Sequence, residues 1–240
     1  MIKKIRSSDL DEQYLAVRPY IATPITVDLQ NKLVTKPWGY EYLMFNNPEI
    51  EVWNLSIKYQ RSTSMHCHPN KKTALIVLEG RALFSTLDGS TELMPSDAVV
   101  IDPKVFHSTQ CISKEGLILL EFETPPMKHD LVRLEDKYGR AQTGYEGADR
   151  MQFDNTHVRL SRTTDQVKIN GTDLTLKSVT SHKDINRSNS VRHLVVLLSG
   201  AVKSARGEIL YQPPHVLAPE ELHDASHVFE GVSIMYISTQ

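Results

Sequence analysis

Short apolar runs separated by turn residues recur along the first half of the chain. The run from Thr73 to Gly80 is apolar and ends in a glycine, which predicts a buried strand. Turn residues such as Asp88-Gly89 lie between the runs. The pattern predicts strands over 40–45, 51–58, 62–68, 73–86, 98–101, 106–112 and 117–124. Short strands at this spacing are typical of an all-β sandwich or barrel.

The chain also contains an internal repeat. Three blocks recur in the same order: 73–80 matches 193–200, 100–107 matches 216–223, and 115–120 matches 230–235. Ordered blocks of this kind indicate duplication of one structural unit. The sequence therefore predicts two tandem barrels, residues 35–126 and residues 151–240, after an N-terminal helix and arm over 1–34.

Two segments depart from the strand pattern. Residues 9–20 have apolar positions at helical spacing, and Ser8 is the predicted N-cap. The charged segment 127–150 follows a pair of prolines and carries Leu131 and Leu134 on one side of a predicted helical turn. We interpret it as a helical connector between the barrels, laid across one barrel mouth.

Three histidines of the first half have the spacing of metal ligands. His66 and His68 point to one face of a strand, while Cys67 points to the other face. His107 belongs to a later predicted strand. Three neutral imidazoles bind a divalent ion and leave coordination positions open for water or substrate. The sequence thus predicts one metal ion, either Zn, Fe, Ni or Mn, and the alternative is that the histidines are only core or solvated residues.

These histidines stand in recognisable motifs. His66, His68 and Gly80 follow G-x5-H-x-H-x3/4-E-x6-G, and Pro103 and His107 follow G-x5-P-x-G-x2-H-x3-N. On these residues the chain resembles the cupin superfamily. The resemblance implies jelly-roll barrels, also called double-stranded β-helices, and metal ligation by the motif histidines.

The chain departs from the cupin motifs at three positions. Asp97 and Lys104 replace the two glycines of the second motif, and Thr73 replaces the glutamate ligand of the first. Because the carboxylate is missing, a three-histidine site like that of cupin thiol dioxygenases and diketone-cleaving enzymes is an alternative that the residues leave open.

Lys36-Pro37-Trp38-Gly39 stands just before the first barrel. It resembles the beginning of cupin-type mannose-6-phosphate isomerases and related cupins of surface-polysaccharide pathways, over about residues 36–125. This resemblance implies a metal-dependent isomerase or epimerase acting on a sugar, sugar phosphate or nucleotide sugar. The four residues also have a structural interpretation, in which Trp38 plugs one end of the barrel.

Three further residues are candidates for catalysis. Glu121 shares a strand face with Leu119 and Glu123, near the expected metal, and a carboxylate there can move a proton between adjacent carbons. Among the cations near the barrel mouth, Lys72 and Lys104 lie next to motif positions and are expected to assist an anionic substrate. For each of these side chains the alternative is a solvated surface position.

The second half lacks most of the site. Asn186 and Ser188 replace the first two histidines, whereas His223 is retained and His193 stands at the glutamate position. We expect this degenerate barrel to bind no metal of its own and to cover the apolar sheet of the first barrel. A non-catalytic small-molecule-binding protein with two barrels is the third functional alternative.

Composition limits the partners of the protein. The 240 residues carry a net charge of −2 and contain no long basic run, so neither nucleic acid nor a membrane is an expected partner. Two cysteines and the lack of a long apolar stretch favour the cytoplasm. The expected partner is a polyhydroxylated or anionic small molecule, and a homodimer stays open.

Overall fold

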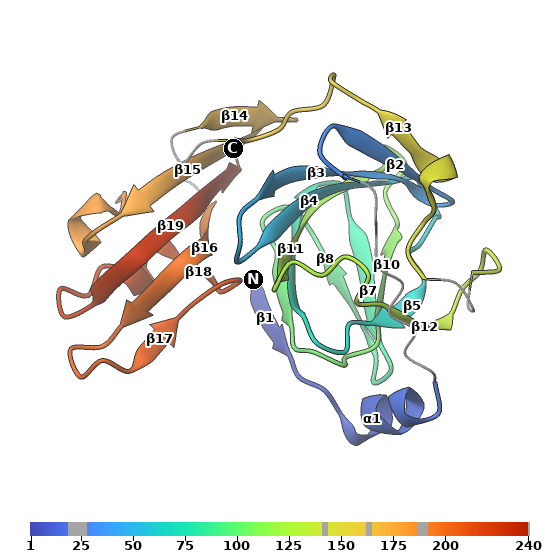
Figure 1. Ribbon diagram of the computed structural model, residues 1–240, viewed down its shortest axis with the longest axis horizontal. Coiled ribbons are helices and arrows are strands. Elements are labelled where there is room, and N and C mark those ends of the chain that lie inside the picture. The colour runs from blue at the N-terminus through green and yellow to red at the C-terminus, as the bar shows by residue number, and fades with distance from the viewer. Residues whose placement is uncertain (19–27, 141–143, 162–164, 187–191, 240) are drawn as a thin grey trace.

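The computed structural model describes residues 1–18, 28–140, 144–161, 165–186 and 192–239. These residues form mostly β-strands, in three sheets (Figure 1). The first sheet has the order β1 (Ile2–Ile5), β9 (Ala98–Ile101), β6 (Lys72–Glu79), β11 (Leu117–Thr124), β4 (Glu51–Ile57), β3 (Gly39–Asn46), β2 (Lys32–Lys36) and β13 (Met151–Phe153). The second has the order β12 (Val132–Glu135), β5 (Met65–Cys67), β10 (His107–Cys111), β7 (Ala82–Thr86) and β8 (Ser90–Leu93).

The strands from β4 to β11 form a jelly roll. Four of them, in the order β9-β6-β11-β4, lie in the first sheet, and the other four, in the order β5-β10-β7-β8, lie in the second. Two four-stranded sheets connected in this way are a double-stranded β-helix. The all-β, jelly-roll prediction for the first half is therefore confirmed.

Alternation along β6 separates the two faces of the first sheet. Leu75 and Val77 belong to the core inside the barrel, whereas Ala74, Ile76 and Leu78 belong to a different core on the outer face. Both faces of the strand are buried, which explains why it appears in the sequence as a continuous apolar run.

The predicted strand over 73–86 is two strands, β6 and β7, that lie in different sheets. The chain turns at Gly80, where φ is +80° and an added Cβ would lie 2.2 Å from the carbonyl oxygen of Gly116. Only glycine fits this close approach without strain. The sequence pattern also missed the short strands β1, β2 and β8.

Helix α1 (Asp9–Ala16) begins where the sequence predicts it. The Ser8 hydroxyl accepts a hydrogen bond from the backbone N of Asp11 at 3.3 Å, as an N-cap does. The helix ends earlier than predicted, and the end of the predicted range, from residue 19, lies outside the described residues. Among the described residues, no helix is long and apolar enough to cross a membrane.

The connector does not contain the predicted helical turn. Its residues 132–135 form strand β12, in which Val132 pairs with Cys67. Val132 and Leu134 pack against Cys67 and Phe106. The helical prediction was wrong because it relied on the three-residue spacing of Leu131 and Leu134, whereas the apolar residues that pack in this core, Val132 and Leu134, are two residues apart, as in a strand.

The second half repeats the strand pairing of the first. Its sheet has the order β14 (Gln166–Ile169), β15 (Thr172–Val179), β19 (Val228–Thr239), β16 (Arg192–Lys203) and β17 (Ile209–Tyr211), with β18 (Val216–Leu217) paired to β16. Leu197 pairs with Ile234 as Val77 pairs with Leu119 at the equivalent positions. The described residues of this half join into one sheet, so a second closed barrel stays a prediction.

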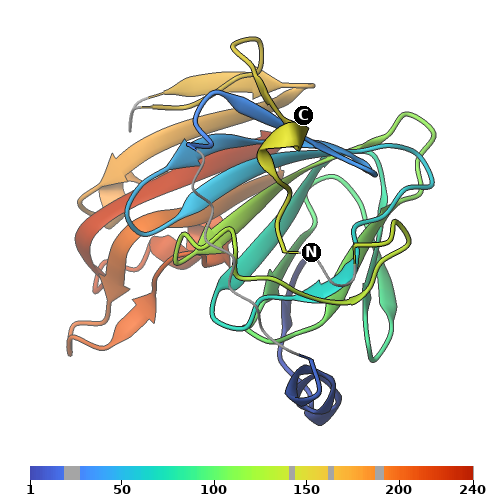
Figure 2. The same ribbon diagram turned by 45° about the vertical axis from the view of Figure 1, so that its right-hand side comes forward.

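The two halves share a hydrophobic core. The outer face of β3, β4, β6 and β11 packs against one face of β15, β16 and β19, which lie beside it in both views (Figures 1 and 2). Phe122 and Ile76 from the first half and Val196 and Met235 from the second are all fully buried in this core. The second half therefore covers the apolar outer face of the first-half barrel. The described residues also form three 3-10 helices, which are η1 (Ala148–Arg150), η2 (His182–Asp184) and η3 (Pro219–Leu222).

Candidate metal centre and active site

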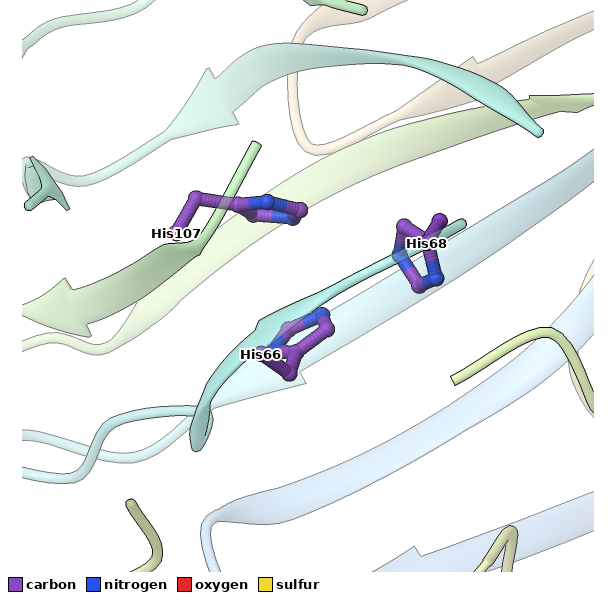
Figure 3. Close-up of side chains that lie close together, drawn as sticks. All are labelled: His66, His68 and His107. Atoms are coloured by element: carbon purple, nitrogen blue, oxygen red, sulfur yellow. The ribbon is translucent and has the colours of Figure 1, made fainter. Parts of the chain in front are cut away.

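The barrel brings His66, His68 and His107 together. His66 and His107 are paired residues on the neighbouring strands β5 and β10, and His68 follows β5 directly. One ring nitrogen from each histidine lies within 4.8 Å of the other two. The ring centroids are 4.5 to 5.4 Å apart. Figure 3 shows the three rings close together. The three residues of the cupin motifs therefore share one place inside the barrel.

Backbone carbonyls orient all three rings. Nδ1 of His66 lies 2.8 Å from the carbonyl oxygen of Ser64, Nδ1 of His68 lies 2.6 Å from that of Asp130, and Nδ1 of His107 lies 2.9 Å from that of Val105. A carbonyl can only accept, so each Nδ1 carries the proton and each Nε2 keeps a free lone pair. Nε2 of His68 is buried and has no hydrogen-bond partner.

Burial keeps the imidazoles neutral. It lowers the pKa of His66 and of His68 well below the usual value, and it lowers the pKa of His107 to about 4. Neutral imidazoles with free Nε2 atoms directed at one point are the donor set that a divalent transition metal prefers. The residues present therefore fit a metal ion.

Helix α1 and the Pro103–His107 turn hold the second motif in place. Asp11 is buried, and its Oδ1 accepts a hydrogen bond from the backbone N of Phe106 at 2.8 Å, one residue before His107. The backbone N of Lys104 donates to the carbonyl oxygen of His68 at 2.8 Å. Lys104 has a left-handed backbone, with φ of +72°, a conformation that favours glycine, which the cupin motif has at this position.

Two carboxylates line the same cavity. Glu121 and Glu123 lie on the inner face of β11, and one oxygen of each lies within 4.8 Å of a ring nitrogen of His68. Oε1 of Glu123 contacts Nζ of Lys71 at 2.7 Å and Nζ of Lys128 at 3.1 Å. Oε2 of Glu121 contacts Nζ of Lys128 at 3.2 Å. The sequence thus placed Glu121 correctly inside the barrel.

The two carboxylates have opposite pKa shifts. Burial raises the pKa of Glu121, against the opposing effect of Lys128. Burial acts in the same direction on Glu123, but Lys128 and Lys71 outweigh it and lower the pKa of that carboxyl. One ionised and one more easily protonated carboxylate lying side by side are a common arrangement in acid–base sites.

The structure does not bring Lys72 or Lys104 to this cavity. Lys72 pairs with Asp102 at 2.9 Å on the outside of the barrel, and Lys104 pairs with Glu12 at 3.6 Å and is half exposed. Lys71 occupies the inner position instead and is almost fully buried. Side chains alternate along an extended chain, so neighbouring lysines face opposite sides.

The connector forms one wall of the cavity. It contributes Lys128, Leu131, Arg133, Arg140, Tyr145 and Glu146, while β2 and β3 contribute Lys36 and Glu41. The cavity volume is about 60 Å³, room for a few water molecules. A substrate of sugar size would extend beyond this volume toward the mouth.

The cations of the cavity already have carboxylate partners. Lys36 contacts Glu41 at 3.2 Å and also pairs with Glu146. Arg140 contacts Asp136 at 2.7 Å and Glu146 at 2.5 Å. The sequence patterns did not point to these acidic partners. Glu41 was detectable, because it shares the inner face of β3 with Leu43, but the connector residues have no periodic pattern.

In the second half, the described residues keep only part of the site. Nδ1 of His193 lies 2.6 Å from Oγ of Ser238, and Nε2 of His223 is buried without a partner. The backbone N of Asn186, which stands at the position of the first histidine, donates a hydrogen bond to the hydroxyl of Tyr236 at 2.8 Å. Ser188 lies outside the described residues.

Comparisons with known proteins give structural likenesses only. No family model matches the chain, and no curated protein matches it. An RmlC-like cupin from Shewanella frigidimarina is 18% identical, covers 44% of this chain and 95% of its own, and has a TM-score of 0.37. A protein with a double-stranded β-helix domain from Klebsiella pneumoniae is 17% identical, covers 52% of this chain and 95% of its own, and has a TM-score of 0.37.

The capsular polysaccharide assembling protein CapF from Staphylococcus aureus is 14% identical, covers 43% of this chain and 34% of its own, and has a TM-score of 0.40. At these scores the likenesses carry no argument about function. The fold assignment rests on the strand order described above, which is that of a double-stranded β-helix.

Proposed function

We propose that this protein is a metal-dependent cupin enzyme that isomerises or epimerises a sugar, sugar phosphate or nucleotide sugar. The observation that supports the proposal is the convergence of His66, His68 and His107, with free Nε2 atoms, beside the buried carboxylate of Glu121. A divalent ion bound there would polarise a substrate carbonyl or bind two adjacent oxygens.

Glu121 is the proposed acid–base residue. Its carboxylate lines the cavity beside His68, and Lys128 holds its Oε2 in place at 3.2 Å. A carboxylate held at the side of a bound substrate can take a proton from one carbon and return it to the neighbouring carbon on the same face, as isomerisation requires. Epimerisation begins with the same proton removal and needs a second acid, or water, to return a proton to the opposite face.

The charges of the cavity favour an anionic or chelating substrate. Lys36, Lys71 and Lys128 are each paired with buried glutamates, so the side-chain charges largely balance one another. Three neutral histidines leave the charge of a divalent ion uncompensated. Carboxylate, phosphate or paired hydroxyl oxygens of the substrate would supply the missing negative charge.

Solvent-exchange measurements test this function. The metal-loaded protein is incubated with a panel of sugar phosphates and uronic acids in D2O, and proton NMR follows deuterium entering the carbon next to the carbonyl. We expect exchange in the wild type, loss of both metal and exchange in His107→Ala, and retained metal with at least about 100-fold slower exchange in Glu121→Gln. Exchange at the wild-type rate in Glu121→Gln would remove this residue from the mechanism.

A three-histidine iron dioxygenase is the second candidate, because Thr73 replaces the carboxylate ligand. The hydroxyl of Thr73 is buried and has no hydrogen-bond partner. Oxygen consumption by the iron-loaded protein, without deuterium exchange in any substrate, would favour the dioxygenase over the isomerase. Ligand binding with neither reaction would favour a non-catalytic binding protein.

A further inference from the structure

Position 73 faces the interior of the barrel but lacks the expected ligand. Thr73 shares the inner face of β6 with Leu75 and Val77, and it is 1% exposed. Its hydroxyl oxygen is buried without a hydrogen-bond partner. A threonine side chain is shorter than glutamate, so it does not extend as far from β6 as the carboxylate ligand of the motif would.

Glu123 lies directly across the sheet from this position. The Cα atoms of Thr73 and Glu123 are register partners on the antiparallel strands β6 and β11. Side chains of such a pair start about 5 Å apart and point to the same face. Glu123 can therefore place its carboxylate in the space that a glutamate at position 73 would occupy.

The two oxygens of Glu123 have different surroundings. Oε1 contacts Nζ of Lys71 at 2.7 Å and Nζ of Lys128 at 3.1 Å. Oε2 is buried and has no hydrogen-bond partner. A buried carboxylate oxygen without a partner is unfavourable, so its position requires a cation or a donor. Nε2 of His68 is also buried and unpartnered, and one carboxylate oxygen lies within 4.8 Å of a ring nitrogen of that residue.

The second half contains the same cross-strand pair with the roles exchanged. His193 is equivalent to Thr73 and Ser238 is equivalent to Glu123, and the two are register partners whose Nδ1 and Oγ lie 2.6 Å apart. In each half, one strand supplies a side chain that can bind metal and the other supplies a short hydroxyl. Either strand can therefore provide the long side chain at this place.

We infer that Glu123 is the fourth protein ligand of the metal ion, supplying from β11 the carboxylate that position 73 lacks. The inference rests on the proposed ion at His66, His68 and His107. Ligands about 2.1 Å from one ion are at most about 4.2 Å apart, and an oxygen of Glu123 lies within 4.8 Å of a ring nitrogen of His68, so coordination by Glu123 requires the glutamate side chain to rotate toward the ion. The ligand set then carries one negative charge, and a substrate would need to neutralise only one further charge.

Titration with Co²⁺ alone tests this inference in the full-length protein. Affinity is measured by competition with a chelator, and the visible absorption of bound Co²⁺ reports a change in its ligands. We expect Glu123→Gln to weaken binding by at least about 10-fold and to change the spectrum. The matched variant Glu121→Gln removes the other carboxylate near His68 and should weaken Co²⁺ binding less than Glu123→Gln does. The double variant Thr73→Glu/Glu123→Gln returns the carboxylate from β6 and should recover most of the affinity.

Three outcomes would overturn the assignment of Glu123. They are an unchanged spectrum and affinity in Glu123→Gln, a larger loss in Glu121→Gln, and no recovery in a double variant whose circular dichroism matches the wild type. A wild-type protein that binds no Co²⁺ would overturn the proposed metal function as well, which distinguishes the two failures. Loss of affinity in Glu123→Gln counts as support only if the variant unfolds in the same cooperative transition as the wild type.

Discussion

Asp130 of the connector accepts a hydrogen bond through its backbone oxygen from Nδ1 of His68, at 2.6 Å. Its buried carboxylate accepts hydrogen bonds from the backbone N of Asn70 at 2.8 Å and of Lys71 at 2.9 Å. One connector residue thus orients a candidate metal ligand, His68, and fixes the turn that directs Lys71 toward Glu123. The connector is part of the candidate site as well as a link between the halves.

Replacing Asp130 by alanine should weaken metal binding, although the Asp130 side chain is not one of the proposed ligands. The variant keeps the backbone oxygen but loses the contacts that hold residues 70 and 71, so His68 is less firmly oriented. We expect metal affinity to fall by about 10-fold or more and the unfolding free energy by about 1–3 kcal/mol. Calorimetric titration with Zn²⁺ and urea unfolding measure the two effects. Asp88→Ala, at an exposed turn, is the control, and an equal loss in both variants would contradict the role of Asp130.

The barrel was predictable because its strands depend on local patterns. Alternating or continuous apolar runs and turn residues define β3, β4, β6, β9, β10 and β11, and strand alternation placed His66 and His68 on one face. Strand alternation also predicts the direction of Lys71. Lys71 is two residues before Thr73, so both side chains point into the barrel, whereas the side chain of Lys72 points to the opposite face. The prediction that Lys72 lines the cavity was therefore wrong by one residue.

The rest of the site depends on contacts between distant parts of the chain. Lys128 contacts Glu121 and Glu123 from a segment without a repeating pattern, and no local rule specifies which wall of the barrel it approaches. The connector was mistaken for a helix for the same reason. Its conformation is fixed by pairing of Val132 with Cys67, a partner that lies in another part of the sequence.

Truncation of a core side chain at the contact between the halves should destabilise the whole protein. Met235 is fully buried in the core shared by both sheets. We expect Met235→Ala to lower the unfolding free energy by about 2–5 kcal/mol while metal stoichiometry is unchanged. Val228→Ala, at a residue that is 45% exposed, should change stability by less than about 0.5 kcal/mol. Two separate unfolding transitions, with only one of them shifted, would show that the halves do not fold as one unit.

Lys104 should be better replaced by glycine than by alanine. Its backbone is left-handed, with φ of +72°, and its side chain makes only an exposed contact with Glu12. Glycine adopts this conformation without the steric cost that a Cβ carries, so Lys104→Gly should be more stable than Lys104→Ala by about 1 kcal/mol. Urea unfolding of the two variants measures the difference. Equal stabilities would mean that the conformation at this position is not strained.

The adjacent lysines at positions 71 and 72 provide a matched test of the candidate site. Nζ of Lys71 is buried against Glu123, whereas the pair formed by Lys72 and Asp102 is about one third exposed. Removing one partner of a buried ion pair leaves an uncompensated charge, and an exposed pair contributes little.

We therefore expect Lys71→Met to lower the unfolding free energy by about 3–5 kcal/mol and Lys72→Met by no more than about 1 kcal/mol, measured by urea unfolding. The two variants lose the same group, one residue apart, so the comparison isolates the direction in which the side chain points. Lys71→Met should also alter the absorption of bound Co²⁺, because Glu123 loses the lysine that holds its Oε1, whereas Lys72→Met should leave it unchanged. A larger effect of Lys72→Met on either measurement would mean that Lys72, rather than Lys71, faces the metal.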